Sequence, residues 1–79
     1  MGTATSTAWW QRVGEGVRVQ LLIQRREINE LAAVLGRGRQ YVSRRLNGHE
    51  PFNMAEIEKI AEWLEVTVES LASTREVQD

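Results

Sequence analysis

The sequence predicts an all-α fold, a small bundle of about five helices that contains a helix-turn-helix. Two observations favour it. Apolar residues recur at helical spacing through most of the 79-residue chain, and a glycine at position 36 separates two short stretches that each have one apolar face. A chain of this length forms one domain. We place that domain at residues 9–72, between a flexible tail at 1–8 and a second tail at 73–79.

The first predicted element covers residues 9–24. Its apolar stripe has helical spacing: Trp10, Val13, Val17 and Leu21. Trp9 and Trp10 could instead mark a partner surface, but we expect this Trp pair in the core. Gly14 and Gly16 each weaken a helix by about 1 kcal/mol. A β-hairpin turning at residues 14–16 is the alternative, because Val17, Val19, Leu21 and Ile23 also alternate. We prefer the helix, since the apolar faces of the following motif need a third helix to cover them.

Residues 31–48 predict the helix-turn-helix. Apolar residues mark the buried faces of its two helices: Leu31, Ala32 and Leu35 in the first, and Val42 and Leu46 in the second. Gly36 suits a helix end with positive φ, and Gly38 can cap the next helix. The turn is short, so the two helices should cross at a steep angle.

The second helix of the motif, residues 39–47, has a polar outer face. With its apolar residues directed to the core, the side chains left outward are Arg39, Gln40, Ser43, Arg44 and Asn47. Arg can bond guanine bidentately and Gln can do the same to adenine, so these types suit the DNA major groove. A solvated polar face is the alternative interpretation. The glycine corner directly upstream favours DNA recognition.

This motif, with Ala32, Gly36, Val42 and the closing Asn47-Gly48, resembles the helix-turn-helix of the lambda repressor and Cro family, and the similarity extends to about Leu71. The resemblance implies base contacts for Arg39, Gln40, Ser43 and Arg44, and a DNA-backbone contact for Asn47. Arg37, just before the helix, is a further expected backbone contact. The sequence departs from the family pattern in two places. Glu27 and Ile28 stand where many members have a Ser or Thr cap followed by Gln, and Arg45 replaces an apolar residue, so its head should reach solvent.

After the motif, residues 47–52 form a loop in which Phe52 should pack back on the core. Asn53 and Glu56 make a capping box for the next helix, whose expected buried stripe is Met54, Ile57, Ile60, Ala61 and Leu64. Thr67 can cap a last short helix with Val68 and Leu71. We expect the carboxylates of this part of the chain on exposed helix faces.

The distribution of charge, the counts of Cys and His and the length of the apolar runs limit the functions that we expect. The net charge of −1 conceals a split, because residues 12–48 hold eight Arg against three Glu, and residues 49–79 hold two basic residues against eight acids. The basic half contains the motif. The chain has no Cys and one His, at position 49 in a loop, so we expect no metal site, no cofactor and no enzymatic activity. No apolar run approaches the roughly 20 residues of a membrane helix, and we expect a cytoplasmic protein without a small-molecule substrate.

These observations predict a sequence-specific regulator that binds double-stranded DNA, a phage or prophage repressor of the Cro type by resemblance. One such domain contacts few base pairs, so we expect a homodimer, at least on a pseudo-palindromic operator. Candidate dimer residues lie in the C-terminal part: Trp63, Val66 and Val68. Two alternatives share the fold: an antitoxin or another protein-interaction module, and an excision or architectural DNA-binding factor.

Overall fold

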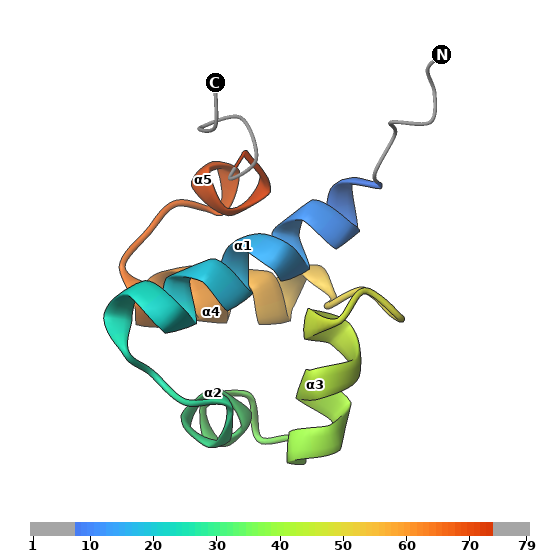
Figure 1. Ribbon diagram of the computed structural model, residues 1–79, viewed down its shortest axis with the longest axis vertical. Helices are drawn as coiled ribbons and strands as arrows, with labels where there is room; N and C mark the ends of the chain where they lie inside the picture. Colours follow the sequence, from blue (N-terminus) through green and yellow to red (C-terminus); the bar gives the residue numbers. More distant parts are fainter. Residues whose placement is uncertain (1–7, 74–79) are drawn as a thin grey trace.

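The computed structural model describes residues 8–73, which form five helices and confirm the predicted all-α bundle. The helices are α1 (Trp9–Gln24), α2 (Ile28–Leu35), α3 (Arg39–Leu46), α4 (Met54–Leu64) and α5 (Val68–Ala72). Residues 1–7 and 74–79, which hold nearly all of the two predicted tails, lie outside the described part. In Figure 1, α1 crosses in front of α4, while α2 is seen along its axis and α3 lengthwise, as expected of a steep crossing.

One helix, α1, covers the core, so the hairpin alternative is wrong. Val13 and Val17 are fully buried. Between them lie Gly14 and Gly16, where the backbones of other helices come close to α1. A Cβ atom at Gly14 would lie 2.8 Å from the Arg45 carbonyl oxygen of α3, and one at Gly16 would lie 2.1 Å from the Leu71 carbonyl oxygen of α5. The glycines thus let two other helices pack directly against α1, which offsets their low helix propensity.

The core gathers apolar residues from all five helices. It includes Leu21 from α1, Leu31 from α2, Val42 and Leu46 from α3, Phe52 from the loop, Ile57, Ile60 and Leu64 from α4, and Leu71 from α5. Two expectations about this core are wrong. Trp9 is 44% exposed at the first turn of α1 and Trp10 is only half-buried, so the Trp pair is not part of the core, and Met54 is 52% exposed at the first turn of α4. All three residues lie at a helix end. Phe52, two residues before Met54, is 4% exposed and packs in the core as predicted.

The helix ends follow the predicted capping chemistry in several places. Gly36 ends α2 with φ of 68°. The Asn53 side chain accepts a hydrogen bond from the Glu56 amide at 2.7 Å, and the Glu56 carboxylate accepts one from the Asn53 amide at 3.0 Å, which confirms the capping box. Thr67 caps α5 by accepting a hydrogen bond from the Ser70 amide at 3.0 Å. These caps fix where α4 and α5 begin.

Candidate nucleic-acid interface

The outer side of α3 carries the side chains that the sequence placed there. We call Arg39, Gln40, Ser43, Arg44 and Asn47 the recognition surface. Four of them are exposed and Ser43 is half-buried, whereas Val42 and Leu46 on the opposite side of α3 are buried. Their spacing along α3 and its C-cap residue Asn47 places these positions on one face over about two turns. The arrangement presents a compact set of hydrogen-bond donors and acceptors.

Neighbouring residues hold parts of the recognition surface in place. Arg39 donates a hydrogen bond to Asn29 Oδ1 in the first turn of α2 at 3.2 Å. Asn47 donates to the Ser43 hydroxyl at 3.4 Å. Arg44 pairs with Glu50 in the following loop. Among residues 8–73, the Gln40 side chain makes no hydrogen bond, so its amide is free for a ligand.

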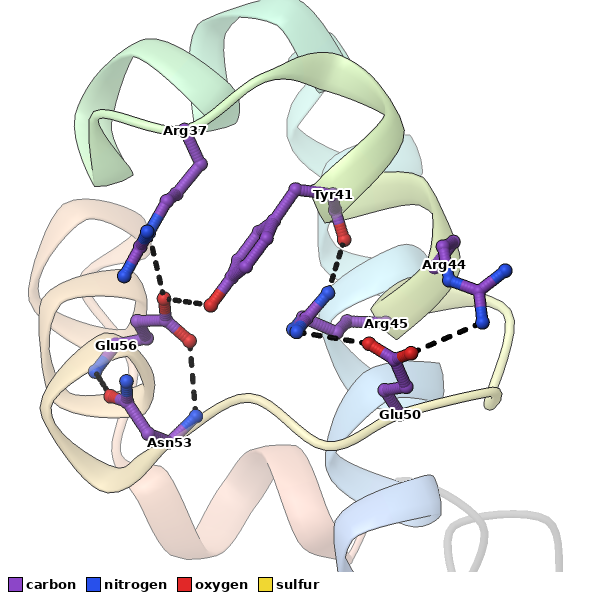
Figure 2. A network of polar contacts seen from close by, with 7 residues as sticks. All are labelled: Arg37, Tyr41, Arg44, Arg45, Glu50, Asn53 and Glu56. Atoms are coloured by element: carbon purple, nitrogen blue, oxygen red, sulfur yellow. Dashed lines mark hydrogen bonds and ion pairs between the residues drawn. The ribbon is translucent and has the colours of Figure 1, made fainter.

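A network of polar contacts joins α3 to the start of α4 (Figure 2). Its centre is Glu56, which is only 6% exposed. The Glu56 carboxylate accepts a hydrogen bond from the Tyr41 hydroxyl at 2.7 Å and lies 3.5 Å from the Nε atom of Arg37. The expectation that the carboxylates of this region lie on exposed helix faces is therefore wrong for Glu56. A buried carboxylate needs such partners, because leaving it unpaired would cost several kcal/mol.

The surroundings of Tyr41 change its acidity. The hydrogen bond to Glu56, burial and the negative charge of Glu56 raise the pKa of Tyr41 above its ordinary value of 10.0, while the charges of Arg45 and Arg37 oppose this shift. Both guanidinium groups lie against the ring, at 3.5 Å for Arg45 and 4.7 Å for Arg37 from the ring centroid. The phenol therefore stays protonated at neutral pH and keeps its hydrogen bond.

The Arg45 guanidinium group contacts other residues of the chain, whereas the sequence analysis expected it to reach solvent. Only 15% of the Arg45 side chain is exposed. It donates to the backbone carbonyl of Tyr41 at 3.0 Å and pairs with Glu50 at 3.0 Å, while its buried Nε has no hydrogen-bond partner in the described part of the chain. Tyr41 and Arg45 are four positions apart on α3, the spacing of one helix face, whereas Arg37 lies in the turn before the helix. The spacing of Tyr41 and Arg45 was the available signal for this part of the network.

Two further arginines, Arg18 on α1 and Arg26 in the segment between α1 and α2, lie near the recognition surface and were not among the expected contacts. Arg18 and Arg26 line a surface hollow of about 320 Å³ together with Ser43 and Asn47, and Leu22 contributes to its apolar lining. Arg18 is exposed. The positive charge beside α3 therefore extends onto α1. From the sequence alone, these residues could be assigned only to a generally basic half of the chain.

The candidate dimer residues Trp63, Val66 and Val68 are half-buried and pack against the core. The Arg26 guanidinium lies 4.8 Å from the centroid of the Trp63 ring. Trp63, Val66 and Val68 remain partly exposed, and their role in a dimer stays a prediction.

Within residues 8–73, no helix combines the length and the apolar character needed to cross a bilayer.

Comparison with known proteins identifies the family of the chain. No curated protein and no solved structure matches the chain. The family model of the BetR domain matches residues 5–79. The chain therefore belongs to the BetR domain family, a family of small helix-turn-helix-like domains, which suggests a small DNA-binding regulatory domain.

Proposed function

We propose that the protein is a sequence-specific transcriptional regulator of the repressor or Cro type, which occupies a double-stranded operator with α3 in the major groove. The observation that carries the proposal is the recognition surface itself: five polar side chains that share the outer face of a helix whose other face is buried. A major groove about 12 Å wide accommodates one α-helix.

The proposed base contacts follow from side-chain chemistry. Arg44 bonds guanine O6 and N7, and Gln40, whose amide is free, bonds adenine N6 and N7. Arg39 and Ser43 contact the bases on either side. Arg39 lies in the first turn of α3, and in helix-turn-helix proteins the N-terminal residues of this helix approach the base edges.

Contacts to the DNA backbone surround these base contacts. Asn47 lies at the C-terminal end of α3 and Arg37 just before its N-terminus, so the two could touch phosphates on either side of the groove. Arg37 is half-exposed although it pairs with Glu56. Arg18 on α1 and Arg26 just after it add positive charge at the edge of the same surface. Such contacts supply affinity and position the helix without selecting bases.

We further propose that two copies bind a pseudo-palindrome with half-site centres about 34–36 Å apart, one helical turn. A single α3 contacts too few base pairs for the roughly 10⁻⁸ to 10⁻¹¹ M affinity of specific binders. The interface would use the exposed parts of Trp63, Val66 and Val68. A small interface of this kind would form on the operator and give cooperative binding.

Selection of bound duplexes from a random DNA pool tests the function. We expect enrichment of one motif with two-fold symmetry. Titration of the full motif and of one half-site, followed by sedimentation of the complexes, then tests the dimer. Recovery of no motif would contradict sequence-specific binding. One protein per saturated duplex, with equal affinity for half and full sites, would contradict the dimer alone.

A further inference from the structure

One carboxylate bridges two consecutive arginines of α3. Glu50 lies in the loop between α3 and α4, directly before Pro51. Its Oε2 atom accepts a hydrogen bond from Arg44 at 3.1 Å, and its Oε1 atom lies 3.0 Å from Nη2 of Arg45. Figure 2 shows Glu50 between the two guanidinium groups, with Arg44 on the outer side of α3 and Arg45 on the side of Tyr41.

The two arginines differ in how firmly they are held. Arg45 is 15% exposed, packs over the Tyr41 ring at 3.5 Å and donates to the Tyr41 carbonyl, so its position is fixed by the protein. Arg44 is 53% exposed, and its one ion pair among residues 8–73 is with Glu50. An exposed pair of two mobile side chains is weak, because both must be ordered to form it. Here Arg45 already orders Glu50, so only Arg44 remains to be fixed.

We propose that Glu50 is a positioning residue that sets the base preference of Arg44. This inference rests on the proposed function, because it assumes that Arg44 contacts a base. Glu50 occupies one N–H of a guanidinium group that has five, and the remaining donors stay available for guanine. Holding the planar group in one orientation favours a bidentate contact to one base over loose contacts to several bases or to phosphate.

The charge of Glu50 acts in the same direction. A carboxylate beside the recognition surface repels phosphates on every DNA sequence, so it weakens nonspecific binding. On the correct site the positioned Arg44 compensates for this repulsion. Glu50 therefore increases the ratio of specific to nonspecific affinity through two separable effects, orientation and charge.

Two substitutions separate these effects. Glu50→Gln removes the charge and weakens the bridge. Glu50→Asp keeps the charge, but its side chain is one methylene shorter and cannot keep the contacts at 3.0 and 3.1 Å to both arginines. Glu58→Gln is the matched control, because Glu58 is an exposed carboxylate on α4 and the change in net charge is the same. Thermal unfolding of each variant verifies that it is folded.

Dissociation constants are measured on the selected site, on the same site with each base pair changed in turn, and on a random duplex. We expect both Glu50 variants to reduce discrimination by roughly tenfold at the base pair that Arg44→Ala also affects. Glu50→Gln should also bind the random duplex more tightly, whereas Glu50→Asp should not. In the double variant Arg44→Ala with Glu50→Gln, discrimination at that base pair should fall no further.

The proposal is overturned if both Glu50 variants keep the wild-type base preference, even if Glu50→Gln binds all duplexes more tightly. Glu50 would then act only as a repulsive charge. The same loss of preference in Glu58→Gln would also overturn it. Failure of the wild-type protein to select any motif would overturn the proposed function itself, and the Glu50 inference with it.

Discussion

Replacement of Gly16 by Ala tests how closely α1 and α5 pack. The added Cβ would lie 2.1 Å from the Leu71 carbonyl oxygen, and ordinary Cβ contacts begin at 3.4 Å. The obstructing atom belongs to the α5 backbone, so no side-chain rotation relieves the contact. The five-residue α5 must therefore move away from α1, and Leu71, which is 1% exposed, loses part of its burial.

The size of the effect follows from two opposing contributions. Forcing extra atoms into a packed interface costs about 1–3 kcal/mol, and complete exposure of one Leu side chain would cost about 1.5–3 kcal/mol. Ala at an interior helix position recovers about 1 kcal/mol relative to Gly. With about half of the Leu71 cost added to the packing cost and the gain in helix propensity subtracted, the free energy of unfolding of Gly16→Ala should fall by roughly 1–3 kcal/mol.

Gly14→Ala is the internal comparison. It gains the same helix propensity, but its Cβ meets the Arg45 carbonyl oxygen at 2.8 Å, a milder overlap than the one at Gly16. Urea unfolding of the wild type and both variants, followed by circular dichroism, gives the three free energies. We expect Gly16→Ala to be the least stable. A Gly16→Ala protein as stable as the wild type would refute the close approach of α1 and α5.

Three further predictions concern the proposed interface. Arg44→Ala should weaken binding to the selected site by about 1–3 kcal/mol and blur preference at one base pair, as measured by titration of singly changed sites; equal weakening on random DNA would make Arg44 a phosphate contact. Arg18→Ala should weaken binding to both DNAs and reduce the slope of log affinity against log salt by about one, and an unchanged slope would exclude a phosphate contact. Tyr41 is the one tyrosine of the chain, so its titration can be followed by tyrosinate absorbance. Because its folded-state pKa is raised, its stabilising contribution is complete below the unfolded pKa near 10 and is lost as pH rises through the folded pKa. This alkaline loss should be absent from Tyr41→Phe, and an identical pH profile for the two proteins would contradict the hydrogen bond to Glu56.

Local patterns were sufficient to predict most of the fold. The motif helices, the turn at Gly36 and the capping box at Asn53 all depend on residues within about four positions of one another. No Gly or Pro marks the end of α1, yet its predicted bound at residue 24 agrees with the structure. Arg25, the residue after α1, adopts the left-handed conformation with φ of 59°, and Glu65, the residue after α4, does the same with φ of 62°. Non-glycine residues in this conformation leave no compositional sign of a helix end.

Contacts between distant residues were not predictable in the same way. Gly14 allows α3 to pack closely against α1, and Gly16 does the same for α5. Both contacts are between residues far apart in the sequence, so the sequence showed only the unfavourable helix propensity of the two glycines. Glu56 was recognised as a capping residue, but its second role depends on Tyr41, fifteen positions earlier. The face of α3 that points outward was predictable, because Val42 and Leu46 define the inner face. Its base contacts remain predictions.

The network around Tyr41 also limits rotation of α3 about its own axis. Only Val42 and Leu46 of α3 are buried, and an apolar strip this narrow resists separation of the helix from the core better than it resists rolling. The Tyr41 hydroxyl bond to Glu56 joins α3 to α4 and has a preferred direction, so it limits rolling on one flank. A roll of α3 would move every side chain of the recognition surface together relative to the groove. Under the proposed function, Glu56 on α4 would therefore help to determine which base sequences α3 can contact, although it is not itself part of the recognition surface.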